Sequence, residues 1–381
     1  MTDVDSIPLS LYVHWPWCVQ KCPYCDFNSH RAGMHDEAER YVDALLRQAE
    51  REWRRTAGRA LQTIFFGGGT PSLMPIGAFE RLMDGLLRIF PSAEAMEVTL
   101  EANPGTTDES RFEAYRRAGV TRLSLGVQSF DSRALARLGR IHDGEAARRA
   151  AAAAVRTFEH VNLDLMFALP QATMDDLERD LETAVSFGTD HLSCYQLTIE
   201  DNTAFAKRPP EGMPDEDAAA KAQELVVERL AAAGFERYEV SAYARAGARC
   251  RHNLNYWRFG DYVGLGAGAH GKLTVPEGVL RTQCPTSPER YMKVVLGGEE
   301  AAQQRFVSAD ELPFEFMLNA LRLTNGVEQP LWRERTGLPD ETLERYLPSL
   351  KARGLWTTTP GRLAASSEGF LFLSEVQAAF L

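Results

Sequence analysis

The sequence predicts an α/β fold built on a partial (β/α)6 barrel, followed by a small C-terminal module of the winged-helix type. Over the first 200 residues, short apolar runs alternate with longer stretches of helical periodicity, which is typical of repeated βαβ units and a parallel sheet. Glycine-rich and polar segments follow these runs at one end only. A six-stranded doubly wound sheet fits the same periodicity, and both folds place an active site at the C-terminal ends of the strands.

The predicted strands are the apolar runs Leu9–His14, Thr63–Gly67, Glu97–Ala102, Arg122–Gly126, Val161–Met166 and His191–Gln196. The predicted helices between them are Asp36–Arg55, Ala78–Ile89, Asp108–Ala118, Asp143–Thr157 and Met174–Phe187, with a further helix at Asp215–Ala233.

Two breaks in this pattern suggest three parts: residues 1–207 as the barrel core, 208–307 as an extension and connecting segment, and 308–381 as the C-terminal module. In the last part, Glu311–Leu323 and Asp340–Arg353 are expected to be helices, and Trp356–Thr358 with Arg362–Ala364 a small hairpin. From residue 301 onward there are 8 basic and 10 acidic side chains. A DNA reader is normally basic, so we expect a structural or interaction module.

The overall charge is also acidic, with 42 basic and 53 acidic side chains and a net charge of −11. This disfavours nucleic-acid partners and broad binding to anionic membranes. No apolar run approaches the roughly 18 residues that a membrane span needs. The acidic N-terminus does not resemble a signal peptide, so we expect a cytoplasmic location.

Three of the six cysteines are crowded directly after the first predicted strand, as Cys18-x-x-x-Cys22-x-x-Cys25. Three thiolates on one loop can ligate three irons of a [4Fe–4S] cluster and leave the fourth iron open to a small molecule. A zinc site would need a fourth ligand, for which His30 is near but follows no usual spacing. A disulfide with a spare thiol is the remaining alternative.

Two further segments at the strand ends are candidates for binding a ligand. Gly67–Thr70 combines three glycines, which let backbone groups approach a ligand closely, with the hydroxyl of Thr70. Its alternative is a plain turn between a strand and a helix. Glu101 ends the third strand, and a carboxylate there suits ribose hydroxyls. Its alternative is a solvated loop carboxylate.

The cysteine spacing resembles the radical S-adenosylmethionine (SAM) superfamily, which implies a partial (β/α)6 radical SAM barrel. The strings Tyr12-Val13-His14-Trp15-Pro16-Trp17-Cys18 and Cys22-Pro23-Tyr24-Cys25-Asp26-Phe27 are similar to the oxygen-independent coproporphyrinogen III oxidase family. The resemblance extends through Gly67–Ser72, Glu101–Pro104, Gly126–Phe130, His252–Trp257 and Gly264–Gly271 to the C-terminal module. Two departures, Phe27 in place of a further cysteine and no room for a longer N-terminal arm, match a heme chaperone branch of this family.

The resemblance implies SAM as a cofactor bound to the open iron, and it assigns residues to two sites. Those of the cluster-bound SAM are Tyr12, Gly68, Gly69, Thr70 and Glu101. Those matching a second SAM site are Tyr24, Gly69, Thr70, Gln128, Arg140 and Asp164. On the pattern alone, Tyr12 fits the core equally well, Arg140 and Asp164 could form a structural ion pair, and the second site could hold another ligand.

The resemblance also implies heme as a ligand, an apo-hemoprotein acceptor to which heme passes, and an electron donor for the cluster. Peripheral membrane association would then come through the acceptor, and the chain would be a monomer or a homodimer. A heme needs an axial ligand, for which His252, in His-Asn-Leu-Asn-Tyr-Trp, is the first candidate, followed by His14 and His270. The alternatives are a coproporphyrinogen oxidase, a radical SAM enzyme with another substrate, and a structural zinc protein.

Overall fold

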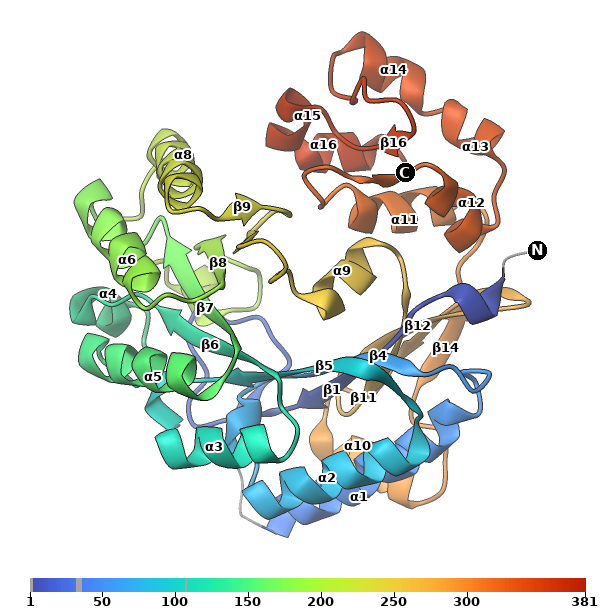
Figure 1. Ribbon diagram of the computed structural model, residues 1–381, viewed down its shortest axis with the longest axis horizontal. Helices are drawn as coiled ribbons and strands as arrows, with labels where there is room; N and C mark the ends of the chain where they lie inside the picture. The colour runs from blue at the N-terminus through green and yellow to red at the C-terminus, as the bar shows by residue number, and fades with distance from the viewer. Residues whose placement is uncertain (1–2, 32–35, 107) are drawn as a thin grey trace.

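The computed structural model describes residues 3–31, 36–106 and 108–381. Its main feature is a twelve-stranded sheet in the order β14-β13-β12-β11-β1-β4-β5-β6-β7-β8-β10-β9. The segment from β11 to β8 is parallel throughout, and antiparallel strands extend it at both ends. The sheet is curved, and its concave face is turned toward the C-terminal module (Figure 1).

The strands of the large sheet are β1 (Leu9–Trp15), β4 (Leu61–Gly68), β5 (Ser92–Ala102), β6 (Arg122–Gln128), β7 (His160–Phe167), β8 (His191–Gln196), β9 (Glu236–Arg237), β10 (Ala242–Ala244), β11 (Asp261–Leu265), β12 (His270–Val275), β13 (Gly278–Gln283) and β14 (Gln303–Phe306). The helices before the C-terminal module are α1 (Asp36–Trp53), α2 (Ile76–Ile89), α3 (Glu109–Arg117), α4 (Ser132–Arg137), α5 (Gly144–Thr157), α6 (Met174–Ser186), α7 (Ala204–Lys207), α8 (Glu216–Ala232), α9 (Arg251–Trp257) and α10 (Pro288–Leu296).

The layering decides between the two predicted α/β folds. Helices α1, α2, α3, α5 and α6 all lie along the outer face of the sheet (Figure 1). The parallel strands from β1 to β8 also follow one another in chain order, without the reversal that a doubly wound sheet requires. The fold is therefore the predicted partial barrel, and the strands that the structure describes form an open sheet.

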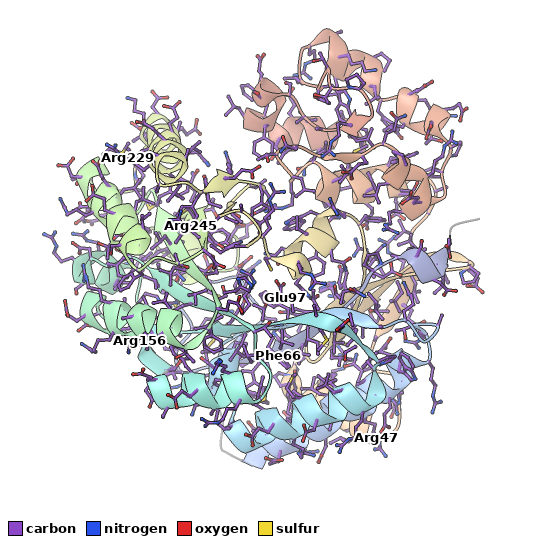
Figure 2. All side chains as sticks on the ribbon, in the orientation of Figure 1. Arg47, Phe66, Glu97, Arg156, Arg229 and Arg245 are labelled. Carbon is purple, nitrogen blue, oxygen red and sulfur yellow. The ribbon has the colours of Figure 1, made fainter. Side chains whose placement is uncertain are left out.

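The two faces of the sheet differ in polarity. Phe66 lies on the face toward the helices (Figure 2), where its ring is 4.9 Å from that of Phe79 in α2 and belongs to the large apolar core. Glu97 lies on the opposite face, toward α9 (Figure 2), and its carboxylate pairs with Arg122 at 3.1 Å. Helix packing thus buries the outer face, while the concave face carries polar groups.

The six predicted strands are confirmed as β1, β4, β5, β6, β7 and β8, and the predicted helices correspond to α1, α2, α3, α5, α6 and α8. The four strands β11 to β14 were not predicted. β11 is five residues long and extends into the glycine-rich segment, so its sequence has little strand periodicity. It joins the sheet beside β1, with Leu11 opposite Val263.

The C-terminal module contains α11 (Leu312–Ala320), β15 (Val327–Glu328), α12 (Pro330–Thr336), α13 (Asp340–Glu344), α14 (Leu347–Ala352), β16 (Arg362–Leu363), α15 (Ser367–Leu371) and α16 (Leu373–Ala378). The helix expected at Asp340–Arg353 is two helices, because Pro348, in the first turn of α14, has no N–H with which to continue the preceding helix. The expected hairpin is a single bridge between Trp356 and Ala365, and β16 pairs with β15 instead.

The module is attached to the connecting segment through a shared core. Phe259, which follows α9, packs against Phe316 of α11 with ring centroids 5.6 Å apart. An ion pair joins Arg322 to Glu239 at 3.2 Å. The boundaries predicted at residues 207 and 307 stay predictions. Among the described residues, no helix combines the length and apolar character that crossing a membrane requires.

Candidate cluster and ligand site

The cysteine loop leaves the sheet at the end of β1 and is closed at its base by the backbone. Strands β2 (Trp17–Cys18) and β3 (His30–Arg31) pair in parallel across it. The amide of Gly69 donates to the carbonyl of Trp15 at 2.7 Å, and that of Thr70 to the carbonyl of Trp17 at 2.9 Å. A Cβ atom on Gly69 would lie 2.7 Å from the Trp17 oxygen, so only glycine allows this approach.

The three clustered thiols are half-buried and reduced. The Thr70 hydroxyl donates to Sγ of Cys18 at 3.4 Å, and the Arg140 guanidinium donates to Sγ of Cys22 at the same distance. Burial raises the pKa of Cys18 and of Cys25, so iron binding would have to displace their protons. In the part of the chain that is described, no three His, Cys, Asp or Glu side chains converge on a single metal position. A [4Fe–4S] cluster presents a separate iron to each thiolate, so the donor set fits it.

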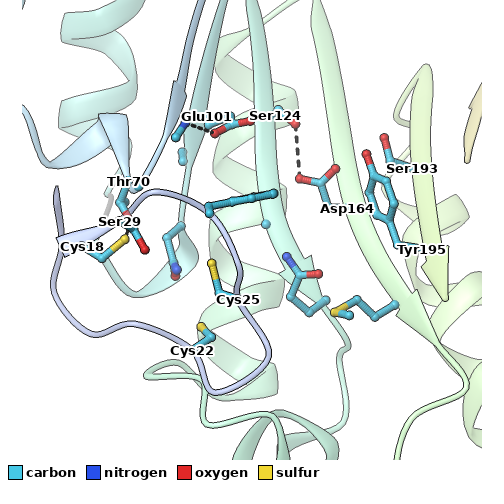
Figure 3. A pocket seen from close by; sticks show the side chains of 18 of the residues that line it. Cys18, Cys22, Cys25, Ser29, Thr70, Glu101, Ser124, Asp164, Ser193 and Tyr195 are labelled. Atoms are coloured by element: carbon cyan, nitrogen blue, oxygen red, sulfur yellow. Dashed lines mark hydrogen bonds between the residues drawn. The ribbon is translucent and has the colours of Figure 1, made fainter. Parts of the chain in front are cut away.

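The thiols open into a cavity of about 520 Å³ inside the barrel mouth (Figure 3). This volume is in the usual range of about 300–1,000 Å³ for small-molecule sites. The cavity contains all the predicted cluster and SAM residues except Tyr12, and none of the three heme-ligand candidates His14, His252 and His270. The predicted residues in the cavity are Cys18, Cys22, Tyr24, Cys25, Gly68, Gly69, Thr70, Glu101, Gln128, Arg140 and Asp164.

Glu101 lies at the end of β5 and points toward the glycine segment (Figure 3). Its Oε2 accepts a hydrogen bond from the Gly68 amide at 3.1 Å. Burial, together with the negative charge of Asp164, raises the pKa of Glu101 to about 8. Gly68 has a φ of +112°, and a Cβ atom there would come within 2.5 Å of the His14 ring. A glycine at position 68 is therefore needed to bring this amide to the carboxylate.

Asp164 and Arg140 do not form the ion pair that was one alternative, because each has partners of its own. Asp164 accepts hydrogen bonds from Ser124 at 3.3 Å and from Asn162 at 2.7 Å. Arg140 donates to the Gly126 carbonyl at 2.7 Å and to the Tyr24 hydroxyl at 3.4 Å. Burial raises the pKa of Asp164 to about 6, against the effect of these hydrogen bonds.

Gln128 reaches the cavity through a distortion of β6. The register between β6 and β7 shifts between Leu125 and Gln128, and Gln128 has a φ of +68°. A non-glycine residue in this region is strained, and such residues gather at functional sites, where a bulge turns a side chain out of the strand pattern. The strain is consistent with the predicted ligand-binding role of Gln128.

Tyr12 and His252 lie outside this cavity. The hydroxyl of Tyr12 is 2.9 Å from Nδ1 of His14, and the residue lines an adjoining cavity together with Gly68 and Glu101. His252 is fully buried, with Nδ1 2.6 Å from the Thr63 hydroxyl and Nε2 2.8 Å from the Tyr256 hydroxyl. Burial lowers the pKa of His252 to about 3. Both ring nitrogens thus have protein partners.

Several cavity residues were not predicted, although the sequence carries a signal for them. Polar side chains recur at every second position along three strands, as Arg122 and Ser124 in β6, Asn162 and Asp164 in β7, and His191, Ser193 and Tyr195 in β8. A period of two places side chains on one face of a strand. Read together, these alternations indicate a polar interior, and Figure 3 shows Ser124, Ser193 and Tyr195 beside Asp164.

Comparison with known proteins agrees with this geometry. The Radical SAM superfamily model matches residues 12–184, and the HemN C-terminal domain model matches residues 307–372. The chain is 45% identical to the "Heme chaperone HemW" of Escherichia coli (strain K12), over 98% of both chains. It is 40% identical to the protein of that name from Mycobacterium tuberculosis, over 86% of this chain and 85% of the relative.

A solved structure supports the fold. The coproporphyrinogen III oxidase HemN of Escherichia coli superposes with a TM-score of 0.83 at 21% identity, covering 99% of this chain and 90% of that one. At this identity the likeness concerns the fold alone. Together with the full-length relatives, it shows that the chain belongs to the radical SAM superfamily and, within it, to the family of the HemW proteins.

Proposed function

We propose that this chain is a heme chaperone, which binds heme and transfers it to an apo-hemoprotein acceptor. The observation that carries the proposal is the 45% identity, over 98% of both chains, with a relative named as a heme chaperone. Phe27 supports it, because a phenyl ring lines the cavity where the oxidase would have a thiol for redox and proton-transfer chemistry.

Cys18, Cys22 and Cys25 would hold a [4Fe–4S] cluster, supplied with electrons by a donor protein. The hydrogen bonds from Thr70 and Arg140 to two of the sulfurs support this assignment, since such donors stabilise sulfur-borne negative charge. The cluster supplies one-electron chemistry at an open iron. The chain's own contribution is to hold the three thiols at a cavity that also presents acceptors to a ligand.

SAM would occupy the cavity beside Gly68, Gly69, Thr70 and Glu101. The amides of all three segment residues are already used within the protein. Any backbone contact with the ligand must therefore come from acceptors, which suit its ammonium group, while the Glu101 carboxylate suits ribose hydroxyls. Tyr12 borders this site from the adjoining cavity.

Tyr24, Gln128, Arg140 and Asp164 would hold a second ligand at the other side of the same cavity. Arg140 keeps Nε free of any hydrogen-bond partner within the described chain, although the atom is buried. A buried donor without a partner is costly, so a ligand acceptor at this point would stabilise the site. A second SAM or another anionic ligand fits this requirement.

Heme transfer can be tested with the full-length chain, reconstituted with iron and sulfide under anaerobic conditions and loaded with ferric heme. It is mixed with an apo-b-type cytochrome, either in one compartment or across a dialysis membrane that passes free heme but no protein. A chaperone should load the acceptor much faster in the shared compartment, because transfer needs protein contact. Equal rates in both arrangements would contradict the proposal.

The same preparation tests the alternative, an oxygen-independent coproporphyrinogen III oxidase. We expect no conversion of coproporphyrinogen III when SAM and a reductant are supplied. Formation of protoporphyrinogen with release of carbon dioxide would restore the oxidase. Measuring heme binding on the same sample ensures that a negative result does not come from inactive protein.

A further inference from the structure

A second cavity, of about 570 Å³, lies against the SAM-side wall of the first. The two cavities share Phe27, Gly68 and Glu101 as lining residues. The second one is bounded by β11 and β12 of the sheet, by the end of α9, and by Asn319 of α11 in the C-terminal module. It therefore lies at a junction between the barrel, the cysteine loop and the module.

The lining of this cavity is strongly aromatic. Tyr256 and Tyr262 lie edge to face with centroids 4.5 Å apart, and Trp257 adjoins Tyr256 at 6.2 Å. Phe27 is 59% exposed, although it is a large apolar side chain on the cluster loop. Tyr256, Trp257 and Tyr262 are half-buried, and Arg322 lies over the ring of Trp257 at 4.3 Å. Aromatic side chains around a concave site suit a flat, aromatic ligand, because rings stack on rings.

His270, which lines this cavity, is unlike the other six histidines that the structure describes. His14, at the same cavity, has Nδ1 2.9 Å from the Tyr12 hydroxyl and Nε2 2.8 Å from the Asn28 carbonyl. His252 is likewise held at both nitrogens. His30, His142, His160 and His191 each have at least one hydrogen bond from the ring. Across residues 3–31, 36–106 and 108–381, His270 alone has a ring with no hydrogen-bond partner, and it is exposed at the start of β12.

We propose that this second cavity is the heme site and that the imidazole of His270 is the axial ligand of the heme iron. The inference rests on the proposed function, which requires a heme site but does not locate it. The first cavity is polar and contains the cysteines and the residues proposed to bind SAM. The second cavity combines aromatic side chains with an imidazole nitrogen that has no hydrogen-bond partner among the residues that the structure describes. A neutral imidazole is a common protein ligand of heme iron.

A second unpartnered group at the same cavity fits a heme. The indole Nε1 of Trp257 is buried and has no hydrogen-bond partner in the described parts of the chain. A propionate or other acceptor on the ligand would satisfy it. By contrast, His252 would have to surrender its contact with Thr63 or Tyr256 to reach an iron, at the cost of a buried hydrogen bond.

The test is a titration of the full-length, cluster-loaded chain with ferric heme, followed by its Soret band and by quenching of tryptophan fluorescence. His270→Ala should shift the Soret band and weaken heme binding by at least about tenfold, since even the loss of groups that merely support a metal ligand costs this much. Added imidazole should restore the spectrum of the His270→Ala protein. His270 is exposed, so the variant should fold, which circular dichroism checks.

His160→Ala and His252→Ala serve as comparisons. His160, a remote histidine paired with Asp190, should leave the heme spectrum unchanged. An unaltered spectrum and affinity in His270→Ala would overturn the inference, as would a folded His252→Ala protein that loses the axial-ligand signature while His270→Ala keeps it. Failure of the unmodified chain to bind heme would instead overturn the proposed function together with the site.

Discussion

Two groups of buried charge in this chain are arranged in opposite ways. At the start of β11, Asp261 forms ion pairs with Arg59 at 2.8 Å and with Lys272 at 2.9 Å, and the Thr274 amide donates a hydrogen bond to it at 2.9 Å. In the cavity, Glu101 accepts a hydrogen bond from the Gly68 amide, and Asp164 accepts hydrogen bonds from uncharged side chains such as Ser124 and Asn162. Neither carboxylate forms an ion pair within the described parts of the chain.

The pKa values show what this difference means. Burial alone would raise the pKa of Asp261, but Lys272 and Arg59 lower it below its usual value. Burial raises the pKa of Glu101 to about 8 and that of Asp164 to about 6, and no partner cation reverses it. The first group is complete within the protein. In the second group no cation pairs directly with either carboxylate, and the Arg140 charge only partly offsets the effect of burial on the pKa of Asp164, as expected of a site that receives a positively charged ligand.

Replacing Cys22 with Ala should abolish cluster binding at the cavity and leave the buried Asp261 group intact. We expect about four irons per chain after anaerobic reconstitution of the unmodified protein and no stable cluster in the variant, because three thiolates are needed to hold it. Iron analysis and the cluster absorption measure this. Cys284→Ala, a buried thiol near Gln48, is the control and should load normally. Full loading of Cys22→Ala would refute the assignment.

Replacing Asp261 with Ala should have the largest effect on stability. Removing one partner of a buried ion pair costs about 3–5 kcal/mol, because Lys272 and Arg59 would be left without a counter-charge. Denaturant unfolding of the apo-protein measures the free energy of unfolding. Glu109→Ala, which removes an exposed ion pair with Arg156, should change it by less than about 1 kcal/mol. Equal losses of unfolding free energy in both variants would show that the buried ion pairs of Asp261 contribute no more to stability than an exposed ion pair.

Glu101→Ala should weaken SAM binding without removing iron. Losing one hydrogen bond to the ligand costs roughly 1–2 kcal/mol, which corresponds to about 5- to 30-fold in affinity. Calorimetry on the reconstituted protein measures the affinity, and iron analysis confirms that the cluster is present. Unchanged affinity would remove Glu101 from the SAM site.

The raised pKa of Glu101 also predicts a pH dependence of SAM binding. The carboxyl is neutral below a pKa of about 8 and negative above it, and SAM has a positive charge at its sulfonium group that does not depend on pH. Affinity should therefore rise as the pH increases from about 7 to 9, by less than tenfold per pH unit. Glu101→Gln cannot ionise, so its profile over this range should be flatter. Parallel profiles would assign the titration to another group.

Most of the barrel and of the first cavity could be predicted from the sequence, because their signals are local. Strand and helix periods repeat along the chain, and the cysteines and glycines stand in short strings at the C-terminal ends of β1 and β4. The surroundings of His252 could not be predicted in this way. Its partner Thr63 lies 189 residues earlier in the chain, so only the folded arrangement shows that the ring is already occupied.

The antiparallel extension shows a different kind of limit. β12 and β13 are joined by a short turn and pair from His270–Gln283 to Val275–Gly278. Polar and apolar residues alternate over Lys272–Val275 of β12 but not along β13, and the sequence does not show which edge of the sheet the two strands will join. That depends on β11 lying beside β1, a contact between segments about 250 residues apart. The same placement of β12 determines what surrounds the His270 ring, so the sequence does not show that this ring lacks a hydrogen-bond partner among the described residues.

The closed base of the cysteine loop has a consequence for cluster assembly. The contacts of Trp15 and Trp17 with Gly69 and Thr70, and of His30 with Pro16, are hydrogen bonds between backbone groups and involve no cysteine sulfur. The conformational entropy of bringing the loop ends together is thus lost during folding of the chain rather than during cluster insertion. Binding of an already assembled cluster then needs to order only the part of the loop that carries the three thiols. Loading and loss of iron should therefore be local, reversible events that leave the barrel folded.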